Sequence, residues 1–242
     1  MQDEFGVLPR MKQLVQSRLF SATLFVFALV SAAQISYAVF ARGPLYALTG
    51  LPQVLEVIGL LLLRTAFTSD DGKTSKTAGL TMVFWVEIVS GVLMVIALVA
   101  AGIVLLNIPE EDFEYIVNQL QLSYSFDLSE FGLGSGEVDL QLIRTAAFRI
   151  LLAFAAVSAL YYTLAALSVR RVRAAIKYNV FIKKIPAVLI GFLAVTAVFS
   201  GLTVYQYVDI TSVFIRLAEV AKAALFAYCA IVFNRQFQTV PL

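Results

Sequence analysis

Six long apolar segments dominate this chain and limit the folds that are open to it. They run over residues 19–41, 44–67, 79–106, 142–168, 185–207 and 209–233. A helix that crosses a membrane needs about 20 mostly apolar residues, because the hydrocarbon core of a bilayer is about 30 Å thick. The chain is also 60% apolar and only 14% charged, which does not fit a soluble domain. The sequence therefore predicts an all-α polytopic membrane protein, a bundle of six transmembrane helices.

The N-terminal segment, residues 1–18, is polar but carries a periodic set of apolar residues. These are Leu8, Met11, Leu14 and Val15. Their spacing fits a short amphipathic helix lying on the cytoplasmic membrane surface. A partly ordered cytoplasmic tail is the alternative, and the sequence leaves both open.

An acidic connection, residues 107–141, separates two membrane halves of three helices each, residues 19–106 and 142–242. It holds eight of the chain's 16 acidic residues and no Lys or Arg. Pro109 is followed by three acids, a pattern typical of a helix start. The next apolar residues keep helical spacing: Phe113, Ile116, Val117 and Leu120. We therefore expect a short amphipathic helix over residues 109–122 of this connection.

The basic segment 169–184 sets the expected orientation. It has six Lys or Arg residues and no acid, so we expect a cytoplasmic loop. Six spans then place both termini in the cytoplasm and the acidic connection outside. Arg170, Arg171 and Arg173 are candidates for binding anionic lipid, although a topology signal alone explains them too.

Charged residues within the apolar segments are the candidate functional residues. They are Glu56, Glu87, Arg149, Arg216, Glu219 and Lys222. A charge at the bilayer centre costs about 2.5–3.5 kcal/mol on insertion scales, so such residues usually face the bundle and find partners. Because Glu56 and Lys222 lie at similar depth in their segments, we expect Lys222 near Glu56 or Glu87.

Two interpretations of these charges stay open. They form either a polar pathway for an ion or charged solute, or structural pairs that fix the packing of the helices. Three acids and three bases can neutralise one another, which favours the structural interpretation.

Several chemistries are excluded by residues that the chain lacks. It has no His and one Cys, Cys229, so histidine catalysis, histidine-bound zinc or haem and an intrachain disulfide are ruled out for this chain alone. The acids after Pro109 lack EF-hand spacing. We expect no catalytic residue, cofactor, metal or nucleic-acid partner.

The first two and last two apolar segments both read as hairpins. At an offset of 163 residues, Glu56-Val57 falls on Glu219-Val220. Internal repeats are common in transporters. Few other positions match, so a duplication and two ordinary hairpins both remain open.

Short motifs suggest a resemblance. Leu51–Leu55, Gly59-Leu60, Gly79–Thr81 and Tyr161-Tyr162 before the basic segment resemble small polytopic membrane proteins of Gram-positive bacteria. The resemblance covers most of the chain. It implies six helices in a bacterial plasma membrane, and it carries over no activity and no functional residue.

The first function that we expect is an integral membrane protein without catalysis. Such a chain would be a subunit or scaffold of a membrane complex, in contact with lipid and with other chains or copies of itself. The alternative is a small-solute or ion transporter, or its substrate-binding subunit, that uses the intramembrane charges. Ala28 and Ala32, an AxxxA pair on the first helix, resemble the substrate-binding subunits of energy-coupling vitamin importers.

Overall fold

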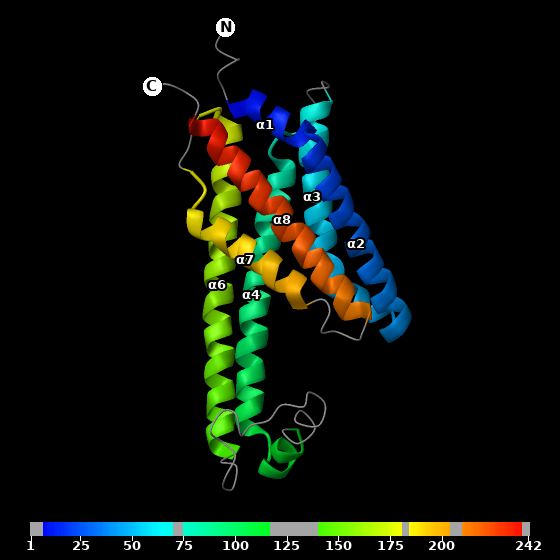
Figure 1. The fold of residues 1–242 in the computed structure, drawn as a ribbon, viewed down its shortest axis with the longest axis vertical. Helices are drawn as coiled ribbons and strands as arrows, with labels where there is room; N and C mark the ends of the chain where they lie inside the picture. Colours follow the sequence, from blue (N-terminus) through cyan, green and yellow to red (C-terminus); the bar gives the residue numbers. More distant parts are fainter. Residues whose placement is uncertain (1–6, 70–74, 117–139, 181–183, 204–209, 239–242) are drawn as a thin grey trace. The chain divides into compact units, whose positions relative to one another are not determined.

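The computed structural model describes residues 7–69, 75–116, 140–180, 184–203 and 210–238, and the elements in these ranges are helices (Figure 1). They are α1 (Val7–Gln16), α2 (Arg18–Arg42), the 3-10 helix η2 (Pro44–Gly50), α3 (Leu51–Thr68), α4 (Ala78–Asn107), α6 (Leu140–Tyr178), α7 (Ala187–Thr203) and α8 (Ile210–Gln238). Within the described ranges, five helices, α2, α3, α4, α6 and α8, are long and apolar enough to cross a membrane. The helical membrane class is therefore confirmed, while the sixth expected span is a shorter apolar helix, α7.

The second apolar segment, expected as one span over residues 44–67, is divided. α2 ends at Arg42 and is followed by Gly43, which has a φ of 100°; the chain then makes the 3-10 helix η2 before α3 begins at Leu51. Pro52 explains this restart, because proline fits the first turn of a helix but not its interior. A side chain at Gly50 would also overlap Ile35 of α2, so the turn packs closely on the preceding helix.

The basic segment, expected as a loop over residues 169–184, is helical through Tyr178 as the end of α6. No Gly or Pro interrupts residues 169–178. The helix ends at Asn179, which adopts a left-handed φ of 49°, and Val180 N–H then donates to the Ala175 carbonyl at 3.2 Å. This is a Schellman-type helix end. The three arginines therefore lie on a helix.

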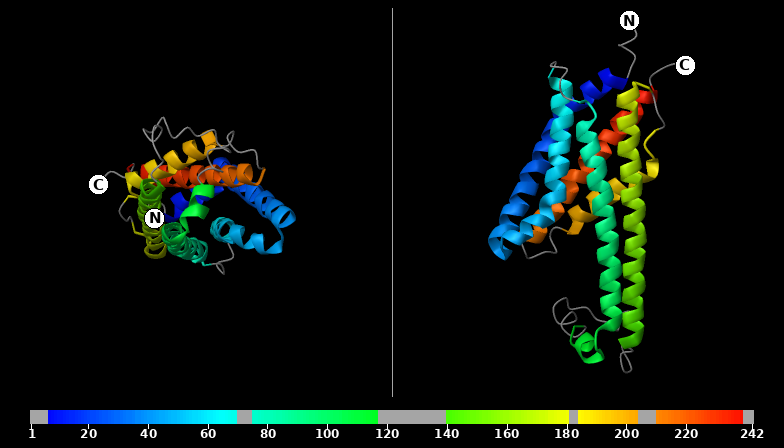
Figure 2. Two further views of the ribbon diagram at one scale, coloured as in Figure 1. Left: turned by 90° about the horizontal axis from the view of Figure 1, so that it is seen from below. Right: turned by 180° about the vertical axis from the view of Figure 1, so that it is seen from behind.

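The chain forms two compact units. The first comprises Met1–Ser90 and Tyr161–Leu242, and the second comprises Gly91–Leu160. In the first unit α8 packs along α2 and α7, as Figure 2 shows, and α1 contacts α2, α3 and α8. The largest fully buried apolar side chains of this unit are Phe20, Phe27, Leu193 and Leu225.

The described part of the N-terminal segment contains α1, so the expected amphipathic helix is confirmed over Val7–Gln16, while residues 1–6 lie outside the described residues. Of its predicted apolar residues, Met11, Leu14 and Val15 are buried against the neighbouring helices, together with Val7, whereas Leu8 is half-buried. Polar contacts hold both ends. Val7 N–H donates to Asn179 Oδ1 at 3.1 Å, and the hydroxyls of Ser17, just past α1, and Tyr228 are 3.2 Å apart.

The second unit contains the start of the acidic connection. Residues 110–116 are helical and Phe113 is buried, as expected, but Ile116 is exposed. Val117 and Leu120, and the rest of the connection to residue 139, lie outside the described residues.

A close crossing of α3 and α4 positions two of the predicted charges in the first unit. A side chain on Gly59 or Gly79 would collide with the carbonyl oxygen of the other glycine. Val83 of α4 also lies against Gly59. Glu56 precedes Gly59 by about one turn and Glu87 follows Val83 by about one turn, so the antiparallel chain direction of the two helices brings both carboxylates to the same side of the crossing.

Candidate functional site

Three helices bring two carboxylates to one ammonium group. Lys222 Nζ on α8 donates to Glu56 Oε1 on α3 at 2.6 Å and lies 3.5 Å from Glu87 Oε1 on α4. The prediction that Lys222 lies near Glu56 or Glu87 is therefore confirmed, and it contacts both. We call these three residues the carboxylate–lysine cluster.

The cluster is buried. The side chains of Glu56 and Glu87 are 1% and 0% exposed, and that of Lys222 is 18% exposed. Glu56 Oε2 and both oxygens of Glu87 are buried without a hydrogen-bond partner in the part of the chain that the structure describes. Buried polar groups of this kind are costly unless something compensates them.

The charges within the cluster do not balance. Two carboxylates and one ammonium leave one negative charge when all three groups are ionised. An uncompensated charge away from water is strongly unfavourable. The cluster therefore has the electrostatics of a site for one further cation, of which a proton is the smallest.

Arg216 and Glu219 form a separate pair on α8, one turn closer to the helix start. Arg216 donates to Glu219 Oε2 at 2.9 Å, and Ser200 of α7 donates to the same oxygen at 3.0 Å. The two charged side chains are 30% and 36% exposed. This pair has the geometry of a structural link between α7 and α8.

Arg149, the sixth predicted site residue, is exposed and belongs to the second unit. The buried arginine there is Arg144, which was not among the predicted site residues. It donates to the Ile108 carbonyl at 2.9 Å and lies over the Phe113 ring at 4.8 Å. The three acids and three bases that could neutralise one another by number therefore do not form a single network.

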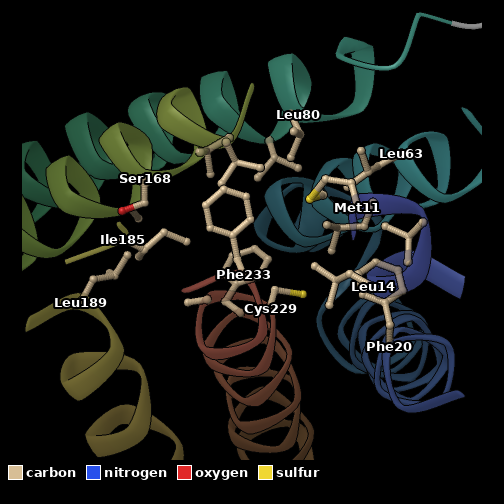
Figure 3. A pocket seen from close by; sticks show the side chains of 18 of the residues that line it. Met11, Leu14, Phe20, Leu63, Leu80, Ser168, Ile185, Leu189, Cys229 and Phe233 are labelled. Carbon is tan, nitrogen blue, oxygen red and sulfur yellow. The ribbon is translucent and has the colours of Figure 1, made fainter. Parts of the chain in front are cut away.

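Figure 3 shows an apolar cavity in the first unit, with a volume of about 100 Å³ and with Glu87 among the residues that line it. Met11 and Leu14 of α1 border it on one side, and Cys229 and Phe233 of α8 on another. Among the described residues, Glu87 is the only charged residue that lines it. The sequence carried no signal for this cavity, because helices distant in the chain form it together.

The described ranges contain no group of three or more His, Cys, Asp or Glu residues that could hold a metal ion. Comparison with known proteins adds no assignment: no family model, curated protein or solved structure matches this chain. The carboxylate–lysine cluster and the adjoining cavity are therefore the basis for a functional proposal.

Proposed function

We propose that this protein is a membrane transporter of a small monovalent cation or cationic solute, or the substrate-binding subunit of one. Glu56 and Glu87 would bind the cation, and Lys222 would be their fixed counter-charge. The observation that carries the proposal is the sharing of one ammonium by two fully buried carboxylates. Ionisable residues buried at membrane depth usually serve ion or substrate pathways.

The hydrogen bonding assigns different roles to the two carboxylates. Glu56 is bonded to Lys222, whereas Glu87 reaches Lys222 only at 3.5 Å and accepts no hydrogen bond from the described residues. A cation at Glu87 would leave the Glu56–Lys222 pair intact and make the cluster neutral. Binding and release of the cation would change the net charge of this buried site by one unit. That difference can favour one conformation when the cation is bound and another when it is absent.

The proposal includes a six-span topology in a bacterial plasma membrane. With 17 residues, α7 spans roughly 26 Å at 1.5 Å per residue, near the lower limit for crossing a membrane. The basic end of α6 supports a cytoplasmic location for it and for both termini. The motif resemblance to Gram-positive membrane proteins supports the plasma membrane, and Arg170, Arg171 and Arg173 are proposed contacts for anionic lipid.

A second candidate function is a non-catalytic subunit or scaffold of a membrane complex, which contacts other chains or copies of itself. It is supported by polar contacts that fix α7, and Ile185 just before it, on α8. Besides the Ser200–Glu219 bond, Asn234 accepts a hydrogen bond from Ile185 N–H at 2.9 Å and donates one to the Ile185 carbonyl at 3.1 Å. In this function the carboxylate–lysine cluster would only fix helix packing.

Ion exchange in proteoliposomes separates the two functions. Vesicles that contain the full chain and a pH dye would be given an outward gradient of Na⁺, K⁺ or an alkylammonium ion in turn. We expect at least one of these gradients to change the lumenal pH with wild type and with Glu219→Gln, but not with Glu87→Gln. Wild-type traces that equal those of empty vesicles for every cation, or equal traces for wild type and a folded Glu87→Gln, would overturn the transport proposal.

A further inference from the structure

The cavity of the first unit is surrounded by side chains from α1, α2, α3, α4, α6, α7 and α8. Most of the residues that line it are buried, and the half-buried ones are Val169, Val172, Phe226 and Cys229. A space closed on so many sides suits a small molecule that enters whole, rather than the end of a long chain whose other end stays outside.

The cavity wall offers no polar group to a ligand. Both oxygens of Glu87 are buried away from any accessible space, and Oε1 lies 3.5 Å from Lys222 Nζ, so this carboxylate belongs to the carboxylate–lysine cluster. The Ser168 hydroxyl, which also lines the cavity, donates to the Leu164 carbonyl at 2.7 Å. A charged or strongly polar ligand would lose its hydration without gaining a partner. The wall therefore selects a neutral, apolar ligand.

The volume limits the size of this ligand. About 100 Å³ is less than the roughly 150 Å³ of an apolar cavity known to bind benzene or xenon. It is about three times the ~30 Å³ that one water occupies in the liquid, but a water would need polar partners that the wall does not supply. A xenon atom or a hydrocarbon of about three or four carbons matches this size and chemistry.

The helix α1 forms one side of the cavity through Met11, Leu14 and Val15. It has only 10 residues, and isolated helices shorter than about 12–15 residues are marginal in water, so α1 depends on its contacts with the other helices. A ligand in the cavity would add dispersion contacts to these three side chains. Ligand binding and the docking of α1 should therefore stabilise each other.

We propose that the cavity is a binding site for a small neutral apolar molecule, and that this molecule holds α1 against the other helices of the first unit. The inference goes beyond the proposed transport of a cation and does not depend on it, because no charged group takes part in the binding. A failure here would leave the ion-exchange test in proteoliposomes unaffected.

Xenon is the probe that tests the place of binding. Crystals of the full chain would be pressurised with xenon, and its anomalous scattering would locate it. We expect a xenon peak in the wild-type cavity, and no peak there in Ala165→Leu or Ala230→Val, which fill part of the space from α6 and α8. Ala174→Leu is the matched control, because Ala174 does not line the cavity and lies about two and a half turns further along α6, on its opposite face.

Hydrogen exchange tests the effect on α1. The amide groups of α1 should exchange at least threefold more slowly under xenon than under helium at the same pressure, because helium gains far less dispersion energy. We expect this slowing in wild type and Ala174→Leu, and none in Ala165→Leu or Ala230→Val, with thermal unfolding showing that each variant is folded. The inference is overturned if the wild-type cavity takes up no xenon or holds a lipid chain instead. It is also overturned if folded cavity-filling variants bind xenon as wild type does, or if α1 exchanges equally under the two gases.

Discussion

Removing the positive charge of Lys222 should destabilise the fold strongly. Lys222→Met keeps an unbranched chain of similar length but leaves Glu56 and Glu87 buried without their ammonium partner. Breaking a buried ion pair by removing one partner typically costs about 3–5 kcal/mol. Two carboxylates share this ammonium, so we expect the free energy of unfolding to fall by an amount within or above that range. At about 2–4 °C per kcal/mol for a chain of this size, the midpoint of thermal unfolding should fall by roughly 6–20 °C.

Neutralising the carboxylates should reverse most of this loss. Adding Glu56→Gln to Lys222→Met removes one uncompensated charge, and adding Glu87→Gln as well removes the second. The unfolding midpoint should therefore rise stepwise from the single to the double to the triple variant. Thermal unfolding followed by circular dichroism in one detergent measures all of them, with Lys177→Met at an exposed position of α6 as the matched control. A Lys222→Met protein as stable as this control, or a triple variant no more stable than Lys222→Met, would refute the reasoning.

Three further predictions concern the site, the helix crossing and the topology. Glu87→Gln alone should leave the unfolding midpoint equal to or above that of wild type, because it leaves one carboxylate for one ammonium; a fall as large as that of Lys222→Met would contradict this. Gly79→Ala should lower the free energy of unfolding by about 2 kcal/mol through collision with the α3 backbone, while Gly191→Ala, where a side chain meets open space, should not; equal effects would contradict the crossing. In a cysteine-free background, Ser135→Cys should react with an impermeant thiol reagent in intact cells and Ala174→Cys should not, and the reverse pattern would overturn the orientation.

The sequence was most informative about charged residues, because the free-energy cost of placing a charge in a membrane largely decides where such a residue lies. Charges in long apolar segments must find partners, and segment depth was enough to place Lys222 near the correct acids. Helical spacing was likewise enough to predict α1 and the start of the helix at residue 110. Helical spacing is a local sequence pattern, and the depth of a residue in the membrane follows from its position within an apolar segment.

The sequence was least informative where distant elements meet. The sequence analysis grouped Arg149 with the other intramembrane charges by number alone. In the structure Arg149 belongs to the second compact unit, and a count of charges does not predict that assignment. In the structure Glu56, Glu87 and Lys222 form one ionic group, and Arg216 and Glu219 form another. The first group therefore has one carboxylate more than it has cations, which a count over the whole sequence does not reveal. The cavity depends on packing among helices far apart in the chain, for which no spacing rule exists.

The central claim, that the carboxylate–lysine cluster holds an exchangeable cation, is tested most directly by infrared difference spectroscopy of the full chain in lipid. Spectra recorded between acidic and alkaline buffer report carboxyl groups that gain or lose a proton. We expect wild type and Glu219→Gln to show the band of a protonated carboxyl in apolar surroundings, and the double variant Glu56→Gln, Glu87→Gln to lack it. A wild-type spectrum without this band, or a band that persists in the folded double variant, would contradict the account.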